Sequence, residues 1–191
     1  MRIALCGAHG VGKSTILKEL KEKLPHYAIS LESLTRKAVS GADKLNLGTT
    51  DESQTILSKA YYHKFLTSPV NYISSRHLVD VLAYTYYIAN KKENIKPETK
   101  SMIEGLLENI IVRNIFDVVF YIPVEFEIPK EELNKEFREG QVDLEYQKTI
   151  DALILNILNK FKIKYILLTG SVEQRIKTVL DIVKFKEGVA L

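Results

Sequence analysis

The sequence predicts an α/β fold built on a five-stranded, parallel, doubly wound sheet. Short apolar strand patterns alternate with longer helical patterns along all 191 residues, which is the order that successive βαβ units produce. One strand pattern, Phe116–Ile122, is almost continuously apolar, as expected of a strand that is buried on both faces. The length suits one domain, and no internal repeat, low-complexity segment or linker divides the sequence.

The predicted strands are short apolar runs, and a segment with helical periodicity follows each of them. The five runs are Arg2–Cys6, His26–Leu31, Pro69–Ile73, Phe116–Ile122 and Ile163–Leu168. Because all five strands are expected to be parallel, ligands should collect where the strands end, at the carboxyl edge of the sheet.

The predicted helices have apolar residues at a spacing of three and four positions. They occupy Thr15–Leu24, a stretch that begins near Glu32, Asp51–Thr67, Arg76–Ala89, Pro97–Arg113, Val142–Phe161 and Ser171–Lys184. Asp51 is expected to be the N-cap of its helix. Residues 41–50 are polar and rich in turn formers, which predicts a loop. Residues 125–140 are charged and lack an apolar stripe, and we expect them to form a mobile cover.

Composition narrows the function classes. The chain is 46% hydrophobic and 27% charged, as in an ordinary globular protein, and its net charge of +3 is too small to predict nucleic-acid binding. Its single cysteine, Cys6, lies in a predicted strand and is expected to be a buried core residue, which fits a reducing, cytoplasmic environment. No secretory signal is expected, and no apolar run approaches the roughly 20 residues that span a membrane.

Residues Gly7–Ser14 read Gly-Ala-His-Gly-Val-Gly-Lys-Ser and match the phosphate-binding loop pattern G-x-x-x-x-G-K-[ST]. A predicted strand precedes the loop and a predicted helix follows it, as this motif requires. Glycines let the backbone wrap around an anion, and N–H groups at the start of the helix point at it. The residues expected to bind ATP here are Gly7, His9, Gly10, Val11, Gly12, Lys13, Ser14 and Thr15.

Two side chains of this loop have specific expected roles. Lys13 places a positive charge at the β- and γ-phosphates, and the Ser14 hydroxyl is a ligand for Mg²⁺. The His9 side chain is expected to point outward from the loop. These expectations predict a protein that binds a nucleoside triphosphate.

Further polar residues follow the other predicted strands. Glu32 follows the second strand, and its carboxylate can serve catalysis or only the helix dipole. Arg76, Asp80 and Tyr84 are spaced i, i+4 and i+8, which places them on one helix face. Arg76 and Asp80 can form an ordinary ion pair, and Tyr84 can be a core residue. Gly170 lies in a loop of small residues after the fifth strand, where an adenine ring can approach the backbone.

These residues give the chain a resemblance to a family of small phosphate-loop kinases. The family includes bacterial nicotinamide-riboside kinases and phage nucleotide kinases, and is similar more distantly to deoxynucleoside and thymidylate kinases. The resemblance covers nearly the whole chain. It rests on Gly7–Ser14, on Glu32 with Arg36, on Ser75-Arg76 with Asp80 and Tyr84, and on shorter echoes at Gln54, 117–123, 169–171, Glu173 and Arg175.

The sequence departs from the family pattern at two places. The family has an aspartate before the arginine that ends the third strand, where this chain has Ser75. The family's cover segment has an Asp-Gly-x-Arg pattern, whereas here Glu139-Gly-Gln-Val142 lacks the final arginine and Arg138 precedes it. These departures concern the acceptor and the catalytic strength, and leave nucleotide binding unchanged.

The resemblance implies a P-loop NTPase fold and phosphoryl transfer from ATP with Mg²⁺ to a nucleoside or nucleotide acceptor. It implies that Glu32 orients the acceptor hydroxyl and that Arg76 contacts the acceptor or the migrating phosphoryl group. Arg36 would bind an acceptor phosphate or sugar, and Arg138 would enter with the cover. Gln54, Asp80 and Tyr84 complete the implied acceptor site.

Two other functions remain open at this point. One is a nucleotide-dependent switch, an ATPase or a polynucleotide end kinase that acts on a macromolecule. The other is a catalytically degenerate protein that only binds nucleotide. A guanine-specific GTPase is disfavoured, because residues 90–93 read Asn-Lys-Lys-Glu and break the Asn-Lys-x-Asp pattern. The sequence leaves open whether the chain forms a homodimer.

Overall fold

The centre of the structure is a parallel five-stranded sheet, here taken from a computed structural model that describes residues 1–30, 49–91, 95–125 and 144–188. The strand order is β2-β3-β1-β4-β5, and every neighbouring pair is parallel. The strands are β1 (Arg2–Cys6), β2 (Ala28–Ile29), β3 (Tyr72–Ser74), β4 (Val118–Tyr121) and β5 (Ile166–Leu167). This confirms the predicted α/β fold with a parallel, doubly wound sheet.

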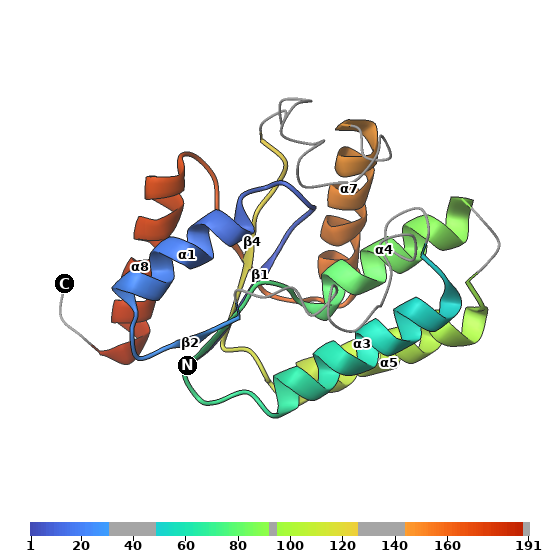
Figure 1. Cartoon of the computed structure of the whole chain (residues 1–191), viewed down its shortest axis with the longest axis horizontal. Coiled ribbons are helices and arrows are strands. Elements are labelled where there is room, and N and C mark those ends of the chain that lie inside the picture. The colour runs from blue at the N-terminus through green and yellow to red at the C-terminus, as the bar shows by residue number, and fades with distance from the viewer. Residues whose placement is uncertain (31–48, 92–94, 126–143, 189–191) are drawn as a thin grey trace.

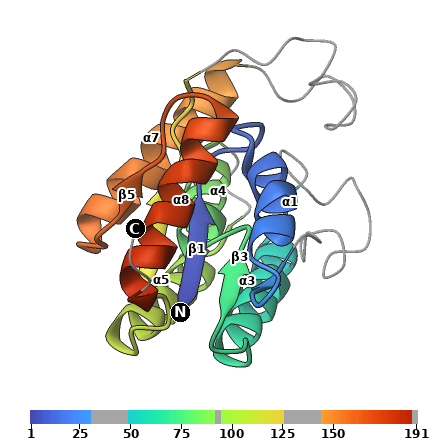
Figure 2. The ribbon, with the colours of Figure 1, turned by 90° about the vertical axis from the view of Figure 1, so that its left-hand side faces the viewer.

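Helices cover both faces of the sheet. Helices α1 and α8 pack together on one face, and α3, α4, α5 and α7 lie on the other (Figures 1 and 2). Their bounds are α1 (Lys13–Lys23), α3 (Asp51–Leu66), α4 (Leu78–Lys91), α5 (Pro97–Val112), α7 (Leu144–Lys160) and α8 (Val172–Glu187). With both faces covered, the central strand β1 is apolar from Ile3 to Cys6, and these four residues are buried.

Every strand except β1 is shorter than predicted, and the edge strands β2 and β5 are the shortest. The predicted strands His26–Leu31 and Ile163–Leu168 contribute only Ala28–Ile29 and Ile166–Leu167 to the described sheet. An edge strand has a partner on one side only, so fewer of its residues are drawn into the ladder. Burial reflects the same difference, because Leu167 is 51% exposed whereas central strand residues are buried.

Two helix starts also differ from the prediction. The N-cap of α3 is Thr50 and not Asp51, because the Thr50 hydroxyl accepts a hydrogen bond from the Ser53 N–H and the Ser53 hydroxyl accepts one from the Thr50 N–H. Helix α4 starts at Leu78, two residues later than the predicted start at Arg76. The side chain of Asp80 accepts the His77 N–H at 2.8 Å and caps the helix there.

The remaining structural expectations have mixed outcomes. Cys6 is fully buried, as predicted, and burial raises the pKa of its thiol. Among the described residues, no helix is both long enough and apolar enough to cross a membrane. The helix expected near Glu32, most of the 41–50 loop and the cover at 125–140 apart from Glu125 lie outside the described residues.

Candidate nucleotide-binding site

The Gly7–Ser14 loop connects the end of the central strand β1 to the start of α1, as the motif predicts. Gly7 is required for close packing, because a Cβ there would lie 2.5 Å from the carbonyl oxygen of Ile122. Gly10 and Gly12 have φ of 76° and 90°, whereas Val11 between them has negative φ. Such alternation makes successive N–H groups converge on one concavity, which favours an anion.

Lys13 is the first residue of α1, and its side chain is folded back over the loop. Its Nζ donates hydrogen bonds to the carbonyl oxygens of Gly7 at 2.5 Å and Ala8 at 2.6 Å. The side chain is 8% exposed, and burial together with the charge of Arg76 lowers the pKa of Lys13 to about 8. Lys13 is buried and Arg76 is partly exposed, so two cations repel one another beside the phosphate loop. Asp80 offsets part of this repulsion, and a bound polyanion would relieve more of it.

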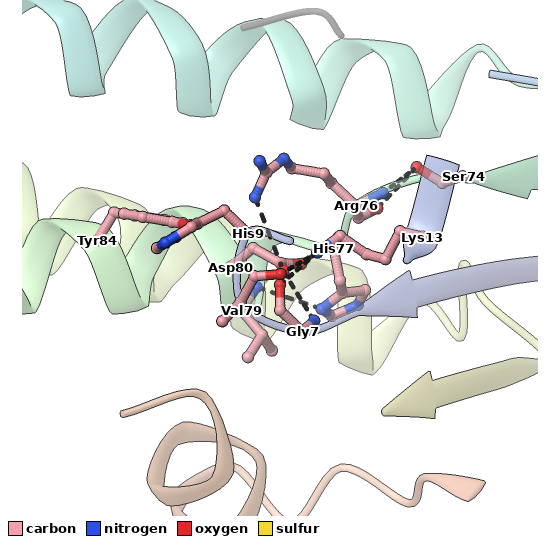
Figure 3. A network of polar contacts seen from close by, with 10 residues as sticks. Gly7, His9, Lys13, Ser74, Arg76, His77, Val79, Asp80 and Tyr84 are labelled. Atoms are coloured by element: carbon pink, nitrogen blue, oxygen red, sulfur yellow. Dashed lines mark hydrogen bonds and ion pairs between the residues drawn. The ribbon is translucent and has the colours of Figure 1, made fainter. Parts of the chain in front are cut away.

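Asp80 ties the phosphate loop to the start of α4. Its carboxylate is fully buried and accepts the N–H of Gly7 at 3.0 Å and that of His77 at 2.8 Å (Figure 3). Arg76 lies 3.9 Å from the same carboxylate. Both oxygens of Asp80 are thus held by backbone donors, and the carboxylate fixes the position at which the loop leaves β1.

Arg76 lies in the turn between β3 and α4, beside the loop. The Ser74 hydroxyl holds this turn, because it donates to the Arg76 carbonyl at 2.7 Å and accepts the Arg76 N–H at 3.3 Å. The Arg76 guanidinium is 5.7 Å from the Tyr84 ring centroid, in a cation–π arrangement. The structure therefore brings Arg76, Asp80 and Tyr84 together, as their spacing predicts (Figure 3).

The prediction that His9 points outward is wrong. His9 is 4% exposed, its Nδ1 is 3.1 Å from the Tyr84 hydroxyl, and its ring stacks on Tyr146 at 5.2 Å between centroids. Burial, followed by the charges of Lys13 and Arg76, lowers the pKa of His9 to about 3, so the ring is neutral at physiological pH. Tyrosines of α4 and α7 cover the loop and enclose this side chain, and no local pattern around His9 signals their presence.

Ser14 and Thr15 lie in the first turn of α1 and are exposed. Among the described residues, no three His, Cys, Asp or Glu side chains gather in a metal-binding cluster. The exposed Ser14 hydroxyl is an oxygen donor of the kind that Mg²⁺ accepts beside substrate phosphates and water.

The predicted adenine-side residue, Gly170, lies in the loop between β5 and α8 with φ of 85°. Its N–H donates to Glu125 at 2.9 Å, and the same carboxylate oxygen lies 2.6 Å from an Nη atom of Arg175. Arg175 also donates to the carbonyl of Val11 at 2.8 Å. These contacts link the phosphate loop to the loop that carries Gly170.

The other predicted acceptor residues have separate outcomes. Gln54 is buried on α3 and accepts a hydrogen bond at 3.0 Å from Thr85, the neighbour of Tyr84 on α4. Glu32, Arg36 and Arg138 lie outside the described residues.

Two buried side chains contact the loop without any signal in the local sequence. Gln147, on α7, is 2% exposed and its Nε2 donates to the carbonyl of His9 at 2.7 Å. Arg175 is one of the shorter matches to the kinase family, and its place in the sequence does not predict its contact with the Val11 carbonyl. Both side chains lie more than a hundred positions from the loop, and no local signal reveals them.

Comparison with known proteins places this site in a family. Residues 2–175 match the family model described as an AAA domain. A search of curated protein sequences gives no match. Among solved structures, the deoxyadenosine kinase from M. mycoides with bound dATP superposes with a TM-score of 0.70 at 19% identity, covering 96% of this chain and 99% of that one.

Two further structures share the fold. NadR in complex with NAD and AMP-PNP has a TM-score of 0.69 at 15% identity and covers 100% of this chain, which matches 50% of NadR. Thymidylate kinase from Candida albicans has a TM-score of 0.57 at 17% identity, covering 99% of this chain and 93% of that one. With the family model matched from β1 to α8 and the phosphate loop in place, the chain belongs to the AAA domain family and has a P-loop kinase-like fold.

Proposed function

We propose that this protein transfers a phosphoryl group from ATP to a nucleoside or nucleotide. The observation that carries the proposal is the convergence of Lys13 and Arg76. The charge of Arg76 contributes to lowering the pKa of Lys13, although one residue starts α1 and the other follows β3. Like charges that lie close together in a partly buried site are unfavourable, and an anion bound beside them stabilises both. The migrating γ-phosphoryl group of a bound triphosphate is an anion of this kind, and positioning with charge neutralisation is what phosphoryl transfer needs.

The donor side of the site is the Gly7–Ser14 loop. Its N–H groups and Lys13 would bind the β- and γ-phosphates, and Ser14 would hold Mg²⁺, which neutralises phosphate charge when bound. Gly170 would lie near the adenine. The described fold supports this assignment, because the loop follows the central strand and α1 starts immediately behind it.

The acceptor side is assigned to the α4 edge of the loop. Arg76 would contact the acceptor or the migrating phosphoryl group, and Tyr84, which faces Arg76, would line the acceptor site. Asp80 would act through the loop, since both of its oxygens hold backbone N–H groups.

Sequence resemblance supplies the rest of the acceptor assignment. Glu32 would orient the acceptor hydroxyl, Arg36 would bind an acceptor phosphate or sugar, and Arg138 would approach with its segment. Gln54 would contribute from α3, where its side chain reaches Thr85 on α4.

The direct test measures ADP release from ATP against a panel of nucleosides and nucleotides. We expect at least one acceptor to raise turnover well above basal hydrolysis, and Glu32→Gln to remove that stimulation without weakening ATP binding. If no acceptor stimulates turnover, the kinase assignment is wrong, and tight, salt-dependent oligonucleotide binding would point instead to a macromolecular substrate.

The donor assignment has its own test. Lys13→Ala should abolish ATP binding or turnover, because it removes the cation that faces the phosphates. An unchanged affinity and rate in this variant would contradict the phosphate-loop assignment.

A further inference from the structure

We propose that Gln147 and Arg175 are positioning residues that aim the N–H groups of Gly10 and Gly12 at the nucleotide phosphates. The inference rests on the proposed ATP-binding function and assigns part of it to two helices outside the motif. Neither side chain needs to touch the nucleotide. Each holds one peptide unit of the phosphate loop by its outer carbonyl.

Gln147 holds the peptide unit between His9 and Gly10. Its Nε2 donates to the His9 carbonyl at 2.7 Å from the first turns of α7, and the side chain is almost fully buried. In a trans peptide the C=O and the following N–H point in opposite directions. A donor that fixes the His9 carbonyl toward α7 therefore directs the Gly10 N–H away from α7. Stacking of Tyr146, the neighbour of Gln147, on the His9 ring holds the same segment.

Arg175 does the same for the peptide unit between Val11 and Gly12. One Nη atom donates to the Val11 carbonyl at 2.8 Å, and the other pairs with Glu125 at 2.6 Å. The side chain is 4% exposed, so water does not compete for these contacts. The Gly12 N–H is directed away from α8 by the same peptide geometry.

We call the Gln147 and Arg175 side chains the two braces of the loop. They reach it from opposite faces of the sheet, because α7 and α8 lie on opposite sides of the sheet (Figure 1). They fix alternate peptide units, which keeps Gly10 and Gly12 in the positive-φ conformation that makes their N–H groups converge. Glycine has many accessible conformations, so an unbraced loop would lose more entropy on binding phosphate. A loop that is already fixed loses less entropy on binding, so its hydrogen bonds to phosphate contribute more to the affinity for the nucleotide.

Gln147→Met and Arg175→Met remove the donors at nearly constant volume. Tyr62→Phe is the matched control for Gln147, because it removes a partly buried side-chain hydrogen bond, to Asn109, between α3 and α5. Arg2→Met is the control for Arg175, because Arg2 also donates to backbone carbonyls of a distant segment, at Ser68 and Pro69. We expect each brace variant to bind ATP and inorganic tripolyphosphate about tenfold more weakly, and both controls to bind as the wild type does.

A spectroscopic readout separates positioning from general destabilisation. The chain has nine glycines, so selective ¹⁵N-glycine labelling gives a simple amide spectrum. Tripolyphosphate should move the Gly10 and Gly12 amide protons downfield in the wild type, as phosphate hydrogen bonds form. Gln147→Met should lose the Gly10 shift and keep that of Gly12, and Arg175→Met should show the reverse.

The inference is overturned if the Gly10 and Gly12 shifts both persist in Gln147→Met and in Arg175→Met. It is also overturned if both shifts disappear in either variant. If Arg175→Met does not fold, Arg175→Lys keeps the charge against Glu125 but lacks the planar fork that reaches two acceptors. It should then lose the Gly12 shift, and a retained shift would refute the role. Failure of the wild type to bind ATP would overturn the proposed function itself, and this is seen before any variant is measured.

Discussion

Asp80→Asn should be among the most damaging single-atom changes in this protein. The wild-type carboxylate is fully buried and accepts two backbone N–H groups, one from Gly7 and one from His77. Asparagine has the same shape but only one oxygen. Its amide nitrogen must therefore face one of the two N–H donors, and that donor is left buried without an acceptor.

The magnitude follows from these contacts. An unsatisfied buried N–H costs about 1–3 kcal/mol, and replacing a charged acceptor with a neutral one weakens the remaining hydrogen bond by about 1 kcal/mol. Arg76 also loses its counter-charge, but its side chain is 23% exposed, so solvent limits this loss to less than about 1 kcal/mol. We expect a total of about 2–5 kcal/mol, which corresponds to a fall in melting temperature of roughly 4–20 °C for a domain of this size.

Chemical and thermal unfolding measure the effect, and Asp117→Asn is the matched control. Asp117 also accepts a backbone N–H, from Arg2 at 2.7 Å, but at an exposed position where its second oxygen is not required. The control should lose less than about 1 kcal/mol. ATP affinity should fall in Asp80→Asn and not in Asp117→Asn, because Asp80 fixes the start of the phosphate loop. Equal stability losses in the two variants would refute the reasoning.

Three further predictions concern proton uptake and helix capping. Because the pKa of free Lys13 is about 8 and bound phosphate should raise it, ATP affinity measured by calorimetry should fall above pH 8 by up to tenfold per pH unit, and an affinity that stays constant above pH 8 would contradict this. Burial lowers the pKa of His9 to about 3 and of His77 to about 4, below the value of about 6.5 in the unfolded chain, so acid protonates the unfolded state first. Denaturant titrations should show a stability loss of about 2 kcal/mol per histidine between pH 7.5 and pH 5, and His77→Phe should remove one such contribution. Thr50→Ala, which deletes the N-cap of α3, should cost about 1 kcal/mol in the same assay at neutral pH, and a loss near zero would contradict that cap.

The sequence predicts the centre of the fold better than its edges. β1 is found at the predicted residues, because its apolar run leads directly into a loop motif that needs a strand before it. The edge strands β2 and β5 are overpredicted, since hydrophobicity alone does not reveal that a segment has one neighbour and not two. The start of α4 is misplaced by two residues because a side chain within the helix, Asp80, sets it.

The site shows the same division between local and distant information. The proximity of Arg76, Asp80 and Tyr84 follows from spacing within one segment, although Arg76 precedes the helix that carries the other two. The burial of His9 and its contact with Gln147 depend on how α7 packs over the loop, and that packing is set by the whole sheet. Spacing within one segment carries no information about such contacts.

The position of β1 in the strand order has a consequence for how the chain folds during synthesis. β1 is the first strand to leave the ribosome, yet it lies between β3 and β4, with Arg2 opposite Tyr72 and Ile3 opposite Val118. Its apolar residues stay unpaired until both neighbours have been synthesised, and the sheet cannot close before β4 is available. Such long-range parallel pairing slows folding and prolongs the exposure of aggregation-prone surface. Removing residues 1–6 would delete the central strand of the sheet.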